Sequence, residues 1–353
     1  MSGFGRVLCV NAGSTSLKLS MVEADGSTTG YDGLQEALAG PRPDVVAHRV
    51  VHGGDRSGAC LVDDAVRTEL HDLTELAPLH QPPALRAMDE ARNALPDVPH
   101  VACFDTAFHR TIPAQAATYA LPARLRAKVR VFGFHGLSHA WAARQARDRV
   151  PGARRVLVAH LGGGASLCAV LEGRSIDSTM GFTPLDGLVM GTRSGHLDPG
   201  AVLWLAEHTD EDLTEVLERE SGLLGLCGTA DMRDVLRLVD SGDDDARLAL
   251  DVYLHRFGAM AASMAASLGG LDVVVLTGGV AEHGGRVNDL LLQRLGWLGV
   301  LTENDTPERS GPLGPDTPPR DLTADGSTAR VLVVHAREDR QMADEARALL
   351  RDL

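Results

Sequence analysis

The most informative stretch of this sequence is Val7-Leu8-Cys9-Val10-Asn11-Ala12-Gly13. A similar stretch returns 149 residues later as Val156-Leu157-Val158-Ala159-His160-Leu161-Gly162. Each copy is an apolar run typical of a strand, followed by small residues and a second apolar run, 17–22 or 167–171. Each copy therefore predicts a β-hairpin, and a one-residue insertion would align Ser16-Leu17 with Ser166-Leu167. The repeat predicts two related halves, and chance similarity of two short apolar stretches is the competing explanation.

The predicted hairpin tips consist of small residues, Gly13-Ser14-Thr15-Ser16 in the first copy and Gly162-Gly163-Gly164-Ala165-Ser166 in the second. Such a turn lets backbone N–H groups approach an anion, and hydroxyl groups add donors. Lys18, one of only two lysines in the chain, follows the first tip. The pair of tips predicts a polyphosphate held between two halves, although a single tip of this kind is also explained by a tight turn alone. The tips are not Walker A loops, because GxxxxGK[ST] does not occur.

The rest of the chain alternates short apolar runs with helical periodicity, which predicts an α/β protein. The expected strands are 45–51, 98–104, 272–277 and 331–334. The expected helices are 83–94, 139–149, 200–220, 232–239, 245–268, 287–295 and 339–350. Segments 178–199 and 302–328 are rich in polar and turn-forming residues and are expected to be loops.

Length and composition limit the class of protein. A chain of 353 residues predicts about two domains. Hydrophobic residues make up 44% of the chain, and no run of about 18 apolar residues suggests a membrane span. The formal charge of −14 argues against nucleic acid or anionic membranes as partners, so an anionic ligand would need local cations. Five scattered cysteines without a CxxC pair, and an N-terminus unlike a signal peptide, favour a reducing cytoplasm.

Histidine-rich segments and two arginines are the candidates for chemistry. His48 with His52, and His135 with His139, have the i, i+4 spacing of helical metal ligands. The sequence lacks an HExxH motif, and a glycine beside His135 disfavours a helix there, so we interpret these imidazoles as partly buried side chains or as participants in catalysis. Arg49 and Arg193 lie in short polar segments near glycines and could supply the cations of an anion site.

Several segments resemble, in order and over nearly the whole chain, the motifs of the acetate kinase family. They are Asn11-x-Gly-Ser-x-Ser-Leu-Lys18, His48-Arg-Val-Val-His-Gly-Gly54, Leu76-Ala-Pro-Leu-His80, Phe104-Asp-Thr-Ala-Phe-His109, Gly133-Phe-His-Gly-x-Ser-His139, Met180-Gly-Phe-Thr-Pro-Leu-Asp-Gly187, Met190-Gly-Thr-Arg-Ser-Gly195, Ser221-Gly-Leu-Leu-Gly225 and Asp231-Met-Arg-Asp234. The resemblance implies two duplicated ribonuclease H-like α/β domains, as in the acetate and sugar kinase, Hsp70 and actin fold, with ATP in the cleft between them. The implied N-terminal acyl-kinase domain is 1–109 with 340–353, and the nucleotide-binding domain is 110–339.

The resemblance also implies an activity: reversible in-line transfer of the γ-phosphoryl group of ATP to acetate or a similar short-chain carboxylate, with Mg2+ or Mn2+. It implies small-molecule partners and a homodimer. A kinase for propionate or butyrate, and a catalytically weak ATP-binding sensor of the same fold, are the alternatives. Retention of the family's phosphoryl-stabilising residues argues against the sensor.

Site residues follow from the same resemblance. Arg49, His135 and Arg193 match positions that stabilise the transferring phosphoryl group, and Asp105 matches the catalytic acidic residue. A short-chain carboxylate is already ionised at neutral pH, so we expect Asp105 to orient an arginine or hydrated Mg2+ rather than to remove a proton. Asn11 and Glu338 match the magnesium positions, and such a cation takes few protein oxygens.

The implied nucleotide contacts come from three segments besides the first tip with Ser14, Ser16 and Lys18. They are His160, Leu161, Gly162, Gly163 and Gly164 for the phosphates; Asp231, Met232 and Arg233 for adenosine; and Gly279, Val280, Ala281, Glu282 and His283 beneath the nucleotide. The acyl group would meet Val51, Leu79, Phe134 and Pro184, together with Arg49. One methylene changes apolar binding by only about 1 to 3 kcal/mol, so this pocket does not separate acetate from propionate.

Some positions depart from the family pattern. Gly163 replaces the usual Asn, Gly279-Val-Ala-Glu-His283 replaces Gly-Ile-Gly-Glu-Asn, and Ala336-Arg-Glu-Asp339 replaces Thr-Asn-Glu-Glu. The segment before His48 is also shorter than usual, by roughly one or two helices. Because alanine restricts φ more than glycine does, we expect a rearranged adenine-side loop around Ala281.

Overall fold

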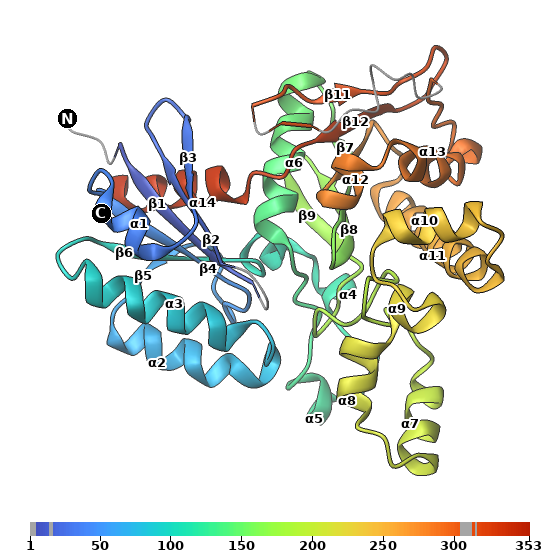
Figure 1. The fold of residues 1–353 in the computed structure, drawn as a ribbon, viewed down its shortest axis with the longest axis horizontal. Helices are drawn as coiled ribbons and strands as arrows, with labels where there is room; N and C mark the ends of the chain where they lie inside the picture. The colour runs from blue at the N-terminus through green and yellow to red at the C-terminus, as the bar shows by residue number, and fades with distance from the viewer. Residues whose placement is uncertain (1–4, 14–16, 304–312, 315) are drawn as a thin grey trace. The chain divides into compact units, whose positions relative to one another are not determined.

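The computed structural model describes residues 5–13, 17–303, 313–314 and 316–353, and its chain contacts divide it into two compact units (Figure 1). The first unit comprises Met1–Arg110, Phe134–Trp141 and Arg337–Leu353, and the second comprises Thr111–Gly133 and Ala142–Ala336. The predicted boundaries differ from this division mainly at 134–141, which the prediction gives to the second domain. These residues join the first unit because the His109 ring bonds the Phe134 carbonyl and the Gly136 N–H bonds the Asp105 carbonyl, both at 2.9 Å.

The first unit is built on a six-stranded mixed sheet in the order β3-β2-β1-β4-β6-β5. Its strands are β1 (Val7–Ala12), β2 (Leu17–Val22), β3 (Thr28–Tyr31), β4 (Val45–Val50), β5 (Cys60–Leu61) and β6 (His100–Phe104). β1 and β2 form the predicted hairpin, while β4 and β6 run parallel to β1. The carboxyl ends of β1, β4 and β6 therefore lie at one edge of this sheet.

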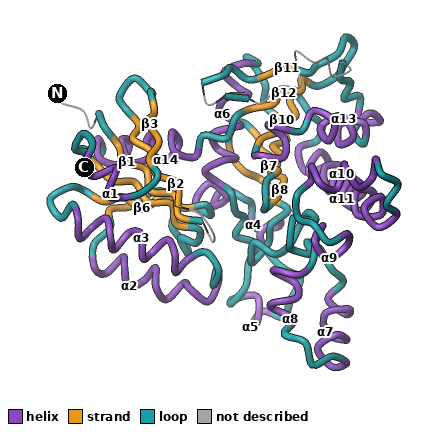
Figure 2. Tube along the Cα trace, viewed as in Figure 1, coloured by secondary structure: helices purple, strands orange, loops and turns teal. Residues whose placement is uncertain are grey.

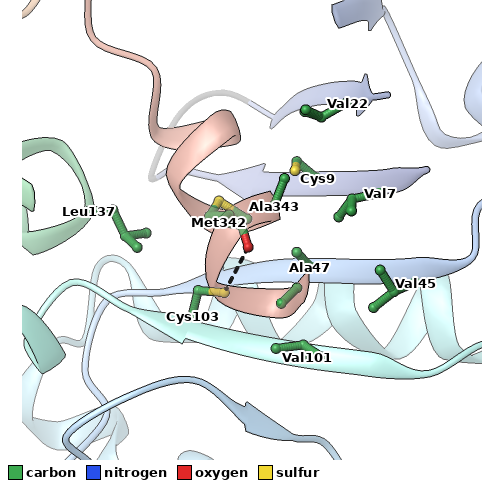
Figure 3. Close-up of a cluster of buried hydrophobic side chains, with 11 residues drawn as sticks. Val7, Cys9, Val22, Val45, Ala47, Val101, Cys103, Leu137, Met342 and Ala343 are labelled. Carbon is green, nitrogen blue, oxygen red and sulfur yellow. Dashed lines mark hydrogen bonds between the residues drawn. The ribbon is translucent and has the colours of Figure 1, made fainter. Parts of the chain in front are cut away.

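Side chains alternate between the two faces of this sheet, as the period of a strand requires. Val7 and Cys9 of β1 face α14 (Glu338–Arg351), which packs on β1, β4 and β6. Figure 3 shows this cluster, in which the Cys103 thiol lies 3.7 Å from the Met342 carbonyl. Leu8 and Val10 face the opposite side, in the same cluster as residues of α1 (Leu34–Ala39) and α3 (Gln81–Ala94). The sheet is thus covered on both faces, and α2 (Asp64–Asp72) packs on α3.

The second unit repeats this sheet. The strand order of the second sheet is β11-β12-β10-β7-β8-β9. Read from β9, neighbouring strands pair antiparallel, antiparallel, parallel, parallel and antiparallel, and the first sheet read from β3 has the same pairings. The strands are β7 (Arg155–Leu161), β8 (Ala165–Leu171), β9 (Arg174–Ser178), β10 (Val273–Thr277), β11 (Arg320–Asp321) and β12 (Arg330–Val334). The predicted duplication is confirmed.

The register corrects one detail of the predicted repeat. Ala12 pairs with Leu17 in the first hairpin and Leu161 pairs with Ala165 in the second, so Leu17 corresponds to Ala165. The prediction that aligns Leu17 with Leu167 is wrong, because the second tip is one residue shorter rather than longer. A shift of two residues keeps every side chain on the same face, so the apolar pattern alone did not reveal it.

Besides its sheet, the second unit contains helices (Figure 2). They are α4 (Ala114–Ala117), α5 (Ala123–Arg126), α6 (Gly136–Arg149, shared between the units), α7 (Pro199–His208), α8 (Leu213–Glu215), α9 (Gly222–Cys227), α10 (Met232–Asp240), α11 (Asp244–Leu268), α12 (Gly279–His283) and α13 (Gly285–Gln293). The predicted helix 200–220 is broken into α7, α8 and a π-helical turn. α11 begins at the Asp243 cap, packs on β7, β8 and β9, and ends at left-handed Gly269. Within the described ranges, no helix is long and apolar enough to cross a membrane.

Candidate active site

Polar side chains gather at the carboxyl edge of the first sheet. Asn11 lies on β1, Arg49 on β4, and Asp105 directly after β6. The guanidinium of Arg49 forms a two-point pair with Asp105: Nε lies 3.1 Å from Oδ1 and Nη2 lies 2.7 Å from Oδ2. Two parallel N–H bonds hold a guanidinium plane in one orientation. The parallel neighbours β4 and β6 thus place a fixed arginine at the edge where α/β sheets bind ligands.

A second carboxylate completes this cluster. Glu338 begins α14, and its Oε2 lies 3.3 Å from Arg49 Nη1 and accepts a 2.8 Å bond from Asn11 Nδ2. Arg49 Nη1 also donates to Asn11 Oδ1 at 3.1 Å. The same residue therefore contacts Asp105, Asn11 and Glu338. We call these four residues the Arg49 cluster.

Charge and burial act in opposite directions in the Arg49 cluster. Burial lowers the pKa of Arg49, but the Asp105 and Glu338 carboxylates outweigh it and raise the pKa above the usual value. Asp105 is only 1% exposed, and its burial raises the pKa of the carboxyl group against the opposing effect of Arg49. Arg49 is therefore a permanent cation, and Asp105 depends on it for compensation.

His135 has an unusual backbone beside this cluster. Its φ is +57°, in the left-handed region that side chains other than glycine seldom adopt. The next residue, Gly136, passes so close to Asp105 that a Cβ there would lie 2.2 Å from the Asp105 carbonyl oxygen. Backbone strain of this kind persists where the surroundings enforce it, often at functional sites. Gly136 therefore ties His135 to the strand end that carries Asp105.

Arg193 lies in a tightly folded turn of the second unit. Its Nη1 donates to the Pro184 carbonyl at 3.0 Å, and burial lowers its pKa while Glu218 opposes that shift. A Cβ on Gly222 would lie 2.3 Å from the Met190 carbonyl and 2.7 Å from that of Arg193. Gly191 donates its N–H to the Gly163 carbonyl at 3.2 Å, so this turn is bonded to the β7–β8 tip.

A cavity of about 520 Å3 lies beside the same tip in the second unit. Its lining residues are Gly162, Gly163, Ala230, Asp231, Met232, Arg233, Leu236, Gly279, Val280, His283, Gly284 and Val287. Asp231 caps α10 through the Arg233 N–H and pairs with the Arg233 guanidinium, whose hydrogen bonds lower the pKa of Asp231 to about 2. The cavity thus has apolar walls, an ion pair and two glycine-rich edges, as expected of a site for a flat ring with phosphates.

Several predicted nucleotide residues do not line this cavity, namely Ala281, Glu282, His160, Leu161 and Gly164. Ala281 and Glu282 are 1% and 4% exposed and lie on the buried side of α12. The Glu282 carboxylate accepts bonds from the backbone N–H groups of Gly278 and Ala336 instead. The backbone of Ala281 is helical, and the rearrangement of this loop relative to the family stays a prediction. His160 lies on β7 opposite Ser166, Leu161 is fully buried, and the Gly164 carbonyl accepts from the Gly162 N–H.

The predicted acyl-pocket residues fall in both units. Val51 and Phe134 are buried in the first unit, Leu79 is half-buried there, and Pro184 belongs to the second unit. Lys18 is exposed. It lies directly opposite Asn11 in the register of the first hairpin, so both side chains are on the same face of the sheet. Ser14 and Ser16 lie outside the described residues.

Asn11 and Glu338 supply adjacent oxygens that fit a hard cation. Mg2+ takes one or two protein carboxylates and keeps several waters. The Asn11 amide and the Glu338 carboxylate share Arg49 Nη1 as a donor and bond each other, so both already meet at one positive charge. Among the residues that the structure describes, no group of three or more His, Cys, Asp or Glu side chains could hold a metal alone. The donor set therefore suits a cation that also binds phosphate and water.

Three glycines that allow two backbone segments to approach closely were not predicted from the sequence as site residues. Gly136, Gly191 and Gly222 let the backbone pass near Asp105, Gly163 and Arg193. Leu236 and Val287 on the cavity wall were not predicted either. The three glycines lie within the motifs that resemble the acetate kinase family, and this was the available signal. Leu236 and Val287 show only the periodicity of ordinary helical positions.

Comparison with known proteins identifies the family of this chain. The family model of the acetokinase family matches residues 40–344. The acetate kinase of Clavibacter sepedonicus is 41% identical, with 97% of this chain and 98% of the relative covered, and that of Leifsonia xyli is 46% identical over 86% and 77%. A crystal structure of a Francisella tularensis propionate kinase has a TM-score of 0.86 at 30% identity, covering 97% of this chain and 98% of that chain. For Porphyromonas gingivalis acetate kinase the values are 0.83, 28%, 98% and 100%.

The family match spans most of the chain, and three of these four proteins are covered almost from end to end. The duplicated sheets agree with the fold of the acetate and propionate kinases. This chain belongs to the acetokinase family, whose members are phosphotransferases with a carboxyl group as acceptor.

Proposed function

We propose that this protein transfers the γ-phosphoryl group of ATP directly and reversibly to acetate or a similar short-chain carboxylate, giving an acyl phosphate and ADP. The observation that carries the proposal is the Arg49 cluster, in which one arginine is held by Asp105, Asn11 and Glu338. Phosphoryl transfer needs fixed positive charge around three equatorial oxygens more than it needs covalent chemistry. A planar guanidinium held in one orientation supplies that charge without reorganising.

Asp105 acts in this proposal as a positioning residue for Arg49. Its two-point pair holds Nε and Nη2, so the remaining Nη1 faces Asn11 and Glu338. The acceptor carboxylate is ionised at neutral pH and has no proton to lose, so the reaction asks for no general base. Burial keeps Asp105 dependent on Arg49, which makes the pair a rigid unit.

His135 and Arg193 are the other two residues that we propose to contact the transferring phosphoryl group. The left-handed residue His135 precedes Gly136, and the backbone of Arg193 lies against Gly222, so a close-packed glycine supports each position. Such enforced positions suit groups that must meet a transition state in one geometry. His135 belongs to the first unit and Arg193 to the second.

Asn11 and Glu338 would hold a divalent cation, for which we propose Mg2+, with Mn2+ as a substitute. When bound, this cation would neutralise phosphate charge. Asn11 Nδ2 donates to the Glu338 carboxylate at 2.8 Å, so the two side chains stay together.

The cavity of the second unit is the proposed adenosine site. Met232, Val280 and Val287 offer apolar walls for a nucleobase. We propose that the His160–Gly164 tip and Lys18, Ser14 and Ser16 contact the phosphates. Val51, Leu79, Phe134 and Pro184 are proposed to enclose the acyl methyl group. A propionate acceptor is the second candidate, supported by the similarity to the Francisella propionate kinase.

We also propose a homodimer through α7. Leu203 and Trp204 of this helix are 68% and 58% exposed, and none of its ten residues is buried. Large exposed apolar side chains in one helix are typical of a protein interface. Trp204→Glu should give monomers in sedimentation, whereas Trp297→Glu, at another exposed tryptophan of the second unit, should leave a dimer. A monomeric wild type would contradict this part of the proposal.

The test of the activity is to trap the acyl phosphate as its hydroxamate. The protein is incubated with Mg-ATP and hydroxylamine, together with acetate, propionate, butyrate or no acid. Rapid product that depends on the acid supports the kinase and ranks its substrates. Arg193→Ala should abolish product but retain ATP binding in calorimetry. Wild-type protein that binds ATP and gives no product with any acid would refute the proposal and favour a nucleotide-binding sensor.

A further inference from the structure

Glu282 is a buried carboxylate that belongs to α12 but does not face the nucleotide cavity. It is 4% exposed and accepts bonds from Gly278 N–H at 3.0 Å and Ala336 N–H at 2.9 Å. Its other oxygen lies 2.5 Å from His335 Nδ1. These bonds join α12, which presents Gly279, Val280 and His283 to the cavity, to the two residues that follow β12. A burial this complete is costly unless such donors compensate it.

The chain beyond Ala336 is anchored on its other side as well. Arg337, 4% exposed, pairs with Asp339 through Nε at 2.9 Å and Nη2 at 2.8 Å, and it also bonds Thr28 of β3. Glu338 lies between these two residues and bonds Asn11 and Arg49. Glu282 holds the N–H group of Ala336, so in the chain only Arg337 separates this held residue from Glu338.

We infer that Glu282 is a positioning residue, which sets the place of Glu338 in the Arg49 cluster by holding the chain between β12 and α14 to the cavity helix α12. The inference rests on the proposed function, because it needs Glu338 to bind the divalent cation and the cavity to bind the nucleotide. Glu282 would thereby connect the cavity helix α12 to the Glu338 side chain through three residues of chain, His335 to Arg337. It need touch neither ligand.

A second carboxylate of the same unit offers a matched control. Asp272 accepts bonds from the N–H groups of Arg154 and Arg155, at 2.9 and 2.8 Å, and pairs with the Arg155 side chain at 2.6 Å. It therefore has the same kinds of bond as Glu282, but it lies before β10, whereas α12 follows this strand. Glu282→Gln and Asp272→Asn each neutralise one carboxylate that holds two backbone N–H groups. Only the first should alter Glu338.

The experiment compares wild type, Glu282→Gln, Asp272→Asn and His335→Asn in the full-length protein. Calorimetry measures ADP binding without metal and then Mg2+ binding to the ADP complex, and the hydroxamate assay gives kcat and KM. Removing a group that orients a metal ligand typically costs about 10- to 100-fold in metal affinity. We expect Glu282→Gln to weaken Mg2+ binding by about tenfold and to lower kcat by a similar factor, with metal-free ADP affinity retained. His335→Asn should change both in the same direction but less.

Asp272→Asn should lower the melting temperature without changing Mg2+ affinity. Equal Mg2+ affinities for Glu282→Gln and Asp272→Asn would overturn the inference, because the effect would then be one of stability alone. If Glu282→Gln does not fold, His335→Asn decides in the same way, and an unchanged Mg2+ affinity would overturn the inference. Wild-type protein that forms no acyl phosphate would instead refute the proposed function, while the calorimetry still reports on Glu282.

Discussion

The two units have the same sheet but place different chemistry at its carboxyl edge. The registers make Asn11 correspond to His160, Arg49 to Thr277 and Asp105 to Ala336. The first unit thus has a fixed cation and its carboxylate where the second has a hydroxyl and a methyl group. One residue further along these strands, Val50 corresponds to Gly278, which starts the glycine-rich entry to α12. The duplicated frame therefore fixes where the edge lies, whereas a few side chains decide whether it holds charge or leaves room for a ligand.

Breaking the charged edge should have the largest effect. Arg49→Lys keeps a positive charge beside buried Asp105 but loses the planar fork. We expect kcat to fall by about 10²- to 10³-fold, as when one donor to a transition state is removed. Arg67→Lys is the control, because Arg67 makes a similar two-point pair with Asp89 in the same unit but lies outside the cluster. Steady-state kinetics check both, and equal losses would contradict the special place of Arg49.

Crowding the backbone that supports this edge should have the next largest effect. Gly136→Ala would place a methyl group 2.2 Å from the Asp105 carbonyl, so the chain at His135 must move. We expect a loss of unfolding free energy of about 1 to 3 kcal/mol, typical of overpacking, together with lower activity. Gly296→Ala is the control, since among described atoms none lies within 4 Å of its added Cβ. Urea denaturation and kinetics would measure these, and an unchanged Gly136→Ala protein would show that the close approach is not needed.

Acid should weaken the first unit before the second. Burial lowers the pKa of His52 and His109 to about 4, and burial also lowers the pKa of His48 and His100. The unfolded chain therefore binds more protons than the folded one, so stability rises with pH between about 4 and 6.5 and is complete above. Each of His52 and His109 contributes about 1.4 kcal/mol per pH unit in this window.

Hydrogen exchange at pH 7 and pH 5 would test this difference between the units. Amides of β4 and β6, which precede His52 and His109, should lose protection at pH 5 more than those of α11 in the second unit. Uniform loss in both units would contradict the assignment of acid sensitivity to the first.

The smallest effect is expected at the nucleotide edge. A Cβ on Gly163 has no described atom within 4 Å, and this glycine is not among those with left-handed φ. Gly163→Asn should change the unfolding free energy by less than about 0.5 kcal/mol. We expect only the KM for ATP to change, because Gly163 lines the cavity. A large loss of kcat would show instead that the β7–β8 tip takes part in catalysis, which the comparison of the two units does not predict.

Sequence patterns predicted the parts of this fold that repeat a period. The apolar runs at 7–12 and 156–161 are central strands, and the duplication follows from them. The break of the helix at 200–220 was missed, although Thr209 ends α7 and the Asp212 side chain caps α8. The Arg49–Asp105 pair could be predicted only as two motif residues, since their contact depends on the register of β4 and β6. The bonds of Glu282 were missed because periodicity says nothing of a partner 54 residues away.

In the proposed reaction, the fixed arginine of the Arg49 cluster stabilises the phosphoryl group that is transferred. Because the proposed reaction is reversible, the most direct test is ATP formation from acetyl phosphate and Mg-ADP, followed by luminescence in wild type and Arg49→Lys. The account predicts rapid ATP formation by the wild type and a rate lower by about 10²-fold or more in the variant, with ADP affinity retained in both. Wild-type protein that binds ADP but forms no ATP, or an Arg49→Lys variant as fast as wild type, would contradict it.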